Sequence, residues 1–178
     1  MTTRSTAVGR RPLLAGARRR AVLTVHLVAA VALLGASIVL LVAGLYAATR
    51  DDPREAHAIY SLLRLLAFSL DVPLAFIALA GGAVLALTSK WGIFRYWWVT
   101  TKLAILLTTI VLGATLIGPS INTMLDVTEA SNPSASSVRW RLVAVASVQV
   151  TLLLGAATLA VFKPGRGVQR PLHPMSGA

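Results

Sequence analysis

The chain has 178 residues, of which 56% are hydrophobic and 13% are charged, and its formal net charge is +11. Soluble domains carry roughly 25% charged residues, and the mean hydropathy of this chain is +0.75. The composition therefore excludes a soluble globular domain, a disordered chain and a fibrous protein, and it indicates an integral membrane protein. The absence of cysteine excludes disulfides, thiolate metal sites and cysteine nucleophiles.

The first predicted helix spans about residues 21–48. The preceding residues 1–20 form a basic tail, expected in the cytoplasm, with six arginines and no acid. The apolar run that follows this tail is longer than the roughly 7–15 apolar residues of a signal peptide. We therefore expect a retained transmembrane helix rather than a cleaved leader.

The second predicted helix spans about residues 58–89. It follows the polar connection 49–57, in which Pro53 and several acids interrupt the apolar run. The helix is longer than the roughly 20 residues that one crossing needs, so its first part is expected to lie in the membrane interface. Pro73 lies inside this helix, where a kink is tolerated if neighbouring groups satisfy the freed carbonyl.

The third and fourth predicted helices follow a compact turn rich in Trp, Tyr, Lys and Arg, the composition of a membrane–water interface. Pro119 is expected to end the third helix, and the longest polar loop comes after it. The last segment contains Gly and Pro and is expected to be a disordered cytoplasmic tail. These segments are the turn 89–98, the third helix at about 98–118, the loop 119–140, the fourth helix at about 142–162 and the tail 163–178.

The basic residues sort to one side of a four-helix arrangement. The two chain ends and the 89–98 turn hold eleven Lys and Arg, whereas the other two loops hold four, together with five of the six acids. The positive-inside rule then places both termini in the cytoplasm. The predicted fold class is all-α: an integral membrane four-helix transmembrane bundle, N-in/C-in, multi-pass in the cell membrane. The high charge is interpreted as a topology signal, and no nucleic-acid partner is expected.

One group of candidate residues lies near the cytoplasmic face. His26 lies about five residues into the first helix and Lys102 lies in the first turns of the third, so the two share a depth. They are interpreted either as a polar pocket, with His26 as ligand or proton carrier, or as structural residues. In the structural interpretation Lys102 reaches the headgroups and His26 hydrogen-bonds a neighbouring helix. The candidate ligand-binding residues are His26, Lys102, Trp91, Arg95 and Trp98.

A second group comprises the intramembrane polar residues Arg64, Asp71 and Gln149. An ionisable group in hydrocarbon costs at least about 2.5–3.5 kcal/mol on insertion scales, so each one requires an explanation. Asp71 is expected near the outer edge of the hydrocarbon, seven residues from Arg64 and roughly on the same helix face. It is interpreted either as an ion or proton entry point or as a boundary carboxylate beside Arg64, Arg139 or Arg141. Gln149 is expected near mid-depth, as a hydrogen-bonding link between helices.

No catalytic residue and no metal site is predicted. The sequence shows no Ser–His–Asp set, no phosphate-binding loop and no HExxH motif. His26 and His57 are expected most of a bilayer apart, so they cannot share one haem iron, and the three methionines are not paired with histidine in the predicted helices. No cofactor is expected. The expected partners are the lipid bilayer and a second copy or another membrane protein.

Two segments resemble a group of known proteins. One runs from His26 to Gly35, and the other is Trp91-Gly92-Ile93-Phe94-Arg95-Tyr96-Trp97-Trp98-Val99, followed by Lys102. They are similar to small, functionally uncharacterised four-helix bacterial integral membrane proteins of actinobacterial type, which carry an H-x-x-x-A…G first helix and a W-G-x-x-R-x-x-W-V-x-x-K turn. That group is distantly similar to the copper resistance D family, from whose copper-handling pattern this chain departs in lacking intramembrane Met and paired His. The resemblance implies the bacterial cytoplasmic membrane as the location. It implies no known activity, but it groups as a set His26, Trp91, Gly92, Arg95, Trp98 and Lys102.

Three functions remain open at the level of the sequence. The leading expectation is a non-enzymatic integral membrane protein that serves as an accessory or structural subunit. The alternative is a small transporter or ligand-binding membrane protein that uses the cytoplasmic-side pocket around His26 and Lys102. A haem or quinone redox protein is the third.

Overall fold

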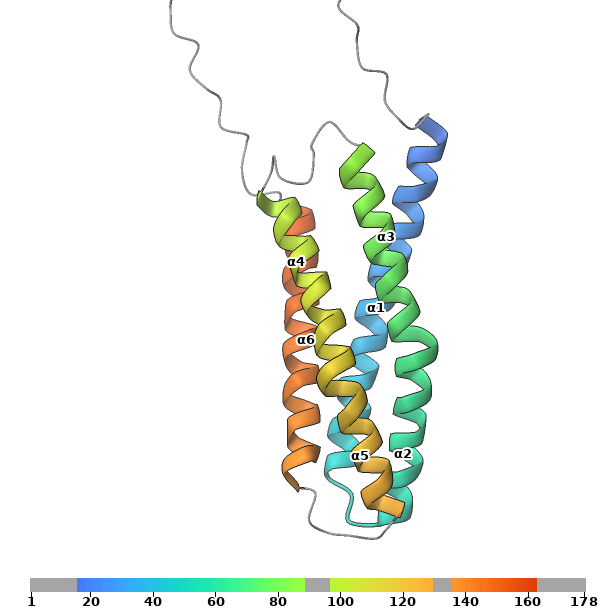
Figure 1. Ribbon diagram of the computed structural model, residues 1–178, viewed down its shortest axis with the longest axis vertical. Helices are drawn as coiled ribbons and strands as arrows, with labels where there is room; N and C mark the ends of the chain where they lie inside the picture. Colours follow the sequence, from blue (N-terminus) through green and yellow to red (C-terminus); the bar gives the residue numbers. More distant parts are fainter. Residues whose placement is uncertain (1–15, 89–96, 130–135, 163–178) are drawn as a thin grey trace, which may run out of the picture.

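The computed structural model describes residues 16–88, 97–129 and 136–162, and nearly all of these residues are helical. They form four long helices (Figure 1), each long and apolar enough to cross a membrane, which confirms the all-α class and the expected number of long apolar helices. Two of the long helices are each interrupted by a π-helical turn. The elements are α1 (Gly16–Ala48), α2 (Pro53–Leu66), the π turn η1 (Ala67–Asp71), α3 (Val72–Thr88), α4 (Trp97–Leu112), the π turn η2 (Gly113–Ile117), α5 (Gly118–Glu129) and α6 (Ser136–Phe162).

The four long helices run alternately up and down and each packs against two neighbours (Figure 1). The continuous helix α2-η1-α3 lies between α1 and α4-η2-α5, and α6 closes the ring against α1 and α4-η2-α5. The start of α1 and the end of α6 therefore lie at one end of the bundle, which we name the upper end after its place in Figure 1. The lower end carries the connection between α1 and α2. Large apolar side chains such as Val31, Leu87 and Val161 are exposed on the outside of the bundle, as expected of a surface that meets lipid.

The second long helix begins earlier than the sequence analysis expected. Asp52 caps it, because its Oδ1 accepts a hydrogen bond of 2.9 Å from the backbone N–H of Arg54. Pro53 is the first helical residue, a position that proline favours because its missing N–H would have no partner there. This corrects the expected start near residue 58: Pro53 ends the polar connection and opens the helix. The first and fourth helices also begin earlier than expected, at Gly16 and Ser136.

The third long helix does not end at Pro119, and this is a correction of the sequence-based boundary. It passes through the proline and continues as α5 to Glu129. Proline lacks an N–H and its ring clashes with the carbonyl four residues earlier in a regular α-helix. The π turn η2 directly precedes the proline, and in it the N–H of Gly118 donates to the carbonyl of Gly113, five residues back. The wider turn re-routes the backbone hydrogen bonds around the proline, so that the helix can continue.

The other π turn has the same relation to a proline. η1 ends at Asp71, two residues before Pro73, and η2 ends at Ile117, two residues before Pro119. The two interruptions are neighbours in space, because a Cβ built on Gly118 would lie 4.0 Å from Cζ of Phe68 in η1. The two interrupted helices are therefore broken side by side, each near the middle of its length.

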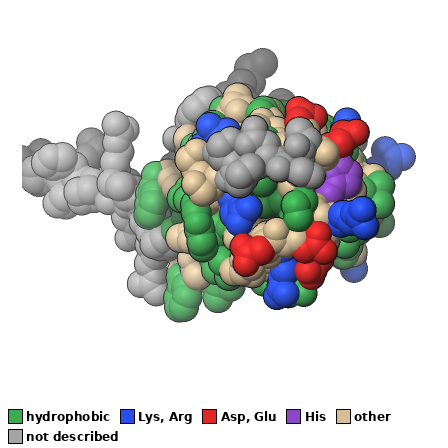
Figure 2. Space-filling view, turned by 90° about the horizontal axis from the view of Figure 1, so that it is seen from below, with side chains coloured by type: hydrophobic (Ala, Val, Ile, Leu, Met, Phe, Trp, Pro, Cys, Tyr) green, Lys and Arg blue, Asp and Glu red, His purple; other side chains and the backbone are tan. Residues whose placement is uncertain are grey.

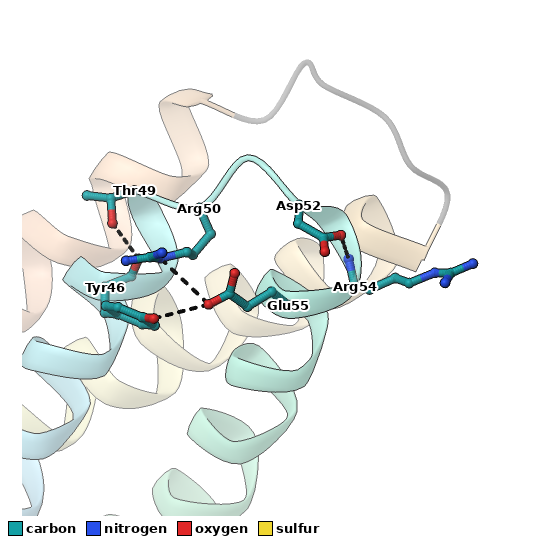
Figure 3. A network of polar contacts seen from close by, with 6 residues as sticks. All are labelled: Tyr46, Thr49, Arg50, Asp52, Arg54 and Glu55. Carbon is teal, nitrogen blue, oxygen red and sulfur yellow. Dashed lines mark hydrogen bonds and ion pairs between the residues drawn. The ribbon is translucent and has the colours of Figure 1, made fainter.

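The lower end of the bundle is polar. Figure 2 views this end and shows Arg, Asp and Glu side chains gathered over it. In the connection between α1 and α2, the hydroxyl of Tyr46 donates to Oε1 of Glu55 at 3.1 Å, and the guanidinium of Arg50 lies 3.9 Å above the Tyr46 ring (Figure 3). Arg50 and Glu55 form an ion pair at 3.7 Å between half-exposed side chains. Such pairs contribute about 0–1 kcal/mol, so this network orients the connection more than it stabilises the bundle.

Arg139 links the start of α6 to the end of α1 by a hydrogen bond. Its Nη1 donates a 3.0 Å hydrogen bond to the carbonyl of Ala48, the last residue of α1. A cation at a helix C-terminus satisfies an unpaired carbonyl and interacts favourably with the helix dipole.

We expect Arg139→Ala to lower the free energy of unfolding by about 1 kcal/mol, because the C-terminal carbonyl of α1 loses a charged donor. Denaturant unfolding in detergent, followed by tryptophan fluorescence, measures the change. Arg141→Ala is the matched control, since Arg141 lies on the same helix and is exposed. Equal losses for the two variants would contradict the capping role of Arg139.

Candidate functional site

Three polar side chains from three helices meet inside the bundle. The hydroxyl of Ser37 on α1 donates to Oδ1 of Asp71 at 2.8 Å. The amide Nε2 of Gln149 on α6 donates to Oδ2 of Asp71 and to the hydroxyl of Ser37, both at 3.1 Å. We name Ser37, Asp71 and Gln149 the central cluster.

The central cluster lies far from the helix ends. Asp71 is 18 residues from Pro53 and 17 from Thr88, and Gln149 is 13 residues from both ends of α6. Ser37 is 11 residues from the end of α1, which is about 17 Å at 1.5 Å per residue. This distance is about half the thickness of a hydrocarbon core of roughly 30 Å.

The position and partners of Asp71 differ from those expected for a boundary carboxylate. In place of Arg64, Arg139 or Arg141 its carboxylate contacts two neutral groups, and this corrects the expected ion pair. Within residues 16–88, 97–129 and 136–162, the ion pair that the structure shows is Arg50–Glu55.

The hydrogen bonds of the cluster do not offset the insertion cost of the carboxylate. A charged Asp in the middle of a spanning helix costs about 2.5–3.5 kcal/mol on insertion scales. Interhelical hydrogen bonds in membrane proteins contribute about 0.6 kcal/mol each on average, so three contribute about 2 kcal/mol. Helix association alone therefore gives a weak reason for an aspartate at this position.

One polar atom of the cluster has no partner. Gln149 is 3% exposed and its Nε2 is used twice, yet its Oε1 is buried with no hydrogen-bond partner in the described parts of the chain. A buried unpaired acceptor costs roughly 1–3 kcal/mol and calls for an explanation. The central cluster thus combines a carboxylate without a counter-ion and an unused amide oxygen.

A π turn at Asp71 changes which residues of this long helix face the inside of the bundle. Asp71 is the last residue of η1, where the N–H of Val72 donates to the carbonyl of Ala67 in the wider π register. Each π turn adds one residue to the helical repeat, so the inward-facing stripe shifts by about one position, from Leu63 and Ala67 to Ala75 and Ala78. π turns inside α-helices are frequent at functional sites.

His26 lies in a close contact between α1 and α3. Its Nδ1 is 2.9 Å from the carbonyl of Ala78, and because a carbonyl only accepts, Nδ1 carries the proton. Its side chain packs directly on Gly81 and Gly82: a Cβ built on Gly81 would lie 2.9 Å from Cβ of His26, and one on Gly82 would lie 3.1 Å from Cε1. This is the interhelical hydrogen bond of the structural interpretation.

Among the remaining candidate residues, Lys102 and Trp98 lie one turn apart on α4. Lys102 on α4 places its Nζ 5.1 Å from the ring centroid of Trp98, one turn earlier on the same helix, a cation–π contact. Arg64 is exposed and lines a shallow surface hollow with Ser61 and Phe68. Trp91 and Arg95 lie outside the described residues.

Ser37 is the member of the central cluster that the sequence analysis missed. A lone serine in an apolar helix is common and carries no periodic signal. Its 2% exposure is the structural observation that sets it apart, because a buried hydroxyl needs a partner.

Comparison with known protein families, curated proteins and solved structures finds no match for this chain. Its class is therefore defined by the fold and the site alone. Four apolar helices of membrane-spanning length indicate a multi-pass membrane protein. Its most unusual feature is an ionisable residue in the middle of the bundle.

Proposed function

We propose that the protein is a small, non-enzymatic transporter or ligand-binding membrane protein whose ligand binds at the central cluster. The observation that carries this proposal is the carboxylate of Asp71, which lies halfway along a spanning helix with two neutral hydrogen-bond donors as partners. Intramembrane ionisable residues that face a bundle interior mark ion or substrate pathways in membrane proteins. The proposed centre is therefore Asp71 rather than the pocket around His26 and Lys102.

We further propose that both chain ends face the cytoplasm of a bacterial cell. The lower end of the bundle carries Arg50, Arg54, Arg139 and Arg141 against five acids, whereas the chain ends and the 89–98 segment carry eleven Lys and Arg. The excess of basic residues on one side supports this orientation under the positive-inside rule. Under it, a ligand at the central cluster lies about midway between the two aqueous phases.

Flux through reconstituted vesicles tests the proposed function. Vesicles that contain the full chain receive an inward gradient of radioactive sodium, with the charge movement balanced by potassium and valinomycin. We expect the wild-type protein to accumulate sodium faster than protein-free vesicles do. Asp71→Asn keeps the shape of the side chain but removes its charge, and it is expected to reduce the rate to that of protein-free vesicles.

Asp126→Asn is the matched control, because Asp126 is an exposed acid on α5 outside the central cluster. It is expected to retain the wild-type rate. A rate for Asp71→Asn equal to that of the wild type would contradict the proposal. A wild-type rate equal to that of protein-free vesicles would contradict transport and leave ligand binding as the proposed role.

The second candidate function is that of an accessory or structural subunit, with a second copy or another membrane protein as partner. The observation in its favour is that the hydroxyl of Ser37 and the amide nitrogen of Gln149 already satisfy both oxygens of Asp71 within one chain. In this case the cluster joins three helices and binds nothing else. It predicts a loss of stability without any effect on flux when Asp71 is replaced.

A further inference from the structure

We propose that the central cluster binds a sodium ion. This inference rests on the proposed function and names the ligand of the same site. It starts from three side chains on three different helices, with 2.8–3.1 Å between their polar atoms. It adds the oxygen Gln149 Oε1, which is buried and has no hydrogen-bond partner among the residues that the structure describes.

The available ligand atoms are oxygens. Asp71 offers its carboxylate and Ser37 its hydroxyl, and both are ligands that hard cations prefer. Gln149 turns its amide nitrogen toward them in this structure. A half-turn of the amide exchanges Nε2 with Oε1, two atoms of nearly the same size. The unpaired oxygen then points at Asp71 and Ser37, an arrangement that is favourable when a cation lies between the three oxygens.

The charge of the site matches a monovalent ion. Asp71 supplies one negative charge, and the neighbouring helices supply no titratable group at this depth. The sequence has none on α1 between His26 and Tyr46, none on α6 after Arg141, and none on α4-η2-α5 between Lys102 and Asp126. On its own helix the nearest is Arg64, seven residues away and exposed. One monovalent cation makes the cluster neutral in hydrocarbon, whereas a divalent ion would leave a net positive charge.

The small spacing of the ligand atoms favours sodium over a larger alkali ion. Ser37 Oγ lies 2.8 Å from Asp71 Oδ1, and Gln149 Nε2 lies 3.1 Å from both Ser37 Oγ and Asp71 Oδ2, so three packed helices hold these atoms close together. Potassium needs longer distances to its ligands, and the helices would have to separate to provide them. We therefore expect the order of affinity to be sodium before potassium.

Thermal unfolding of the purified full-length chain in detergent tests the inference. Sodium chloride replaces choline chloride at constant ionic strength, and unfolding is followed by tryptophan fluorescence. A ligand that binds the folded state alone lowers the unfolding equilibrium constant by a factor of about 1 + [Na⁺]/Kd, which is about 100-fold at a concentration of 100 Kd. We expect a saturable rise in Tm with sodium, and a smaller rise with potassium.

Variants assign the effect to the central cluster. Asp71→Asn and Ser37→Ala are expected to abolish the sodium-dependent rise. The matched control for the serine is Ser147→Ala, because the hydroxyl of Ser147 bonds its own helix at the carbonyl of Val143, and this variant is expected to keep the rise. If Asp71→Asn does not fold, the two serine variants give the same contrast.

A Tm that does not respond to sodium overturns the inference, and so does an equal response in Ser37→Ala and Ser147→Ala. A wild-type Tm that depends on pH but not on sodium also overturns it. A sodium-dependent Tm without any flux in vesicles leaves the binding site in place and contradicts the proposed transport. The two proposals can therefore fail separately.

Discussion

Gly81→Leu is expected to destabilise the bundle by about 3 kcal/mol, at the upper part of the range for overpacked cores. A Cβ at this position would lie 2.9 Å from Cβ of His26 and 3.4 Å from its Cα. Neither atom can move without shifting the backbone of α1, so a leucine must push α1 and α3 apart. Denaturant unfolding in detergent measures the loss, together with the yield of monodisperse protein.

Gly35→Leu is the matched control, because Gly35 lies on α1 and a Cβ built there meets nothing within 4 Å. It is expected to change stability by less than about 0.5 kcal/mol. Replacing His26 by glycine removes the clashing atom, so His26→Gly combined with Gly81→Ala should be more stable than the sum of the two single changes predicts. Additive effects would show that the contact between the two residues does not limit helix packing.

Tyr60→Ala is expected to lower the free energy of unfolding by about 3–5 kcal/mol. The Tyr60 side chain is 0% exposed and belongs to the buried core in the lower half of the bundle, with Ile121, Met124 and Leu142. Removing a buried aromatic side chain forfeits its packing and leaves a cavity. Unfolding in detergent, with refolding checked for reversibility, measures the loss.

Tyr60→Phe is expected to raise the free energy of unfolding, the opposite of the effect of Tyr60→Ala. The hydroxyl of Tyr60 is buried without a hydrogen-bond partner in the described parts of the chain, and an unpaired buried polar group costs about 1–3 kcal/mol. The phenylalanine variant should therefore be more stable by about 1 kcal/mol. Tyr46→Phe is the control, since it removes an exposed hydroxyl that bonds Glu55, and its effect should be small. A loss of more than about 1 kcal/mol in Tyr60→Phe would mean that the hydroxyl has a partner.

Hydropathy and the charges of the loops together predicted the number of long helices, because a spanning helix needs a continuous apolar run and chain ends on the same side need an even number of spans. The boundaries at Pro53 and Pro119 were wrong for one physical reason. Proline signals an interruption of regular α-helix, but it also occupies the first helical position or follows a wider turn at little cost. At Pro53 the cap by Asp52 decides the outcome, and at Pro119 the π turn η2 does. Neither feature is visible in a hydropathy pattern.

The central cluster was predicted only in part. Gln149 was expected at mid-depth between helices, and the structure shows it bonded to α1 and η1. Asp71 was interpreted either as an ion or proton entry point or as a boundary carboxylate beside Arg64, Arg139 or Arg141, and Arg64 was expected roughly on its helix face because residues seven apart share a face of a regular α-helix. η1 lies between the two and breaks that repeat, so Arg64 is exposed while Asp71 contacts Ser37. Ser37 could not be found, because its role depends on two residues far away in the chain.

The two π turns also divide the bundle into two regular helices and two interrupted ones, which are expected to differ in stiffness. α1 and α6 are unbroken along their whole lengths, whereas their two neighbours are each interrupted at adjacent points. Departures from regular α-helical hydrogen bonding are where long helices kink, so flexing of this bundle should concentrate at that level. α2 and α5 pack against each other, so we expect them to tilt together relative to the unbroken helices α1 and α6. Asp71, the last residue of η1, lies at the level where this tilt begins.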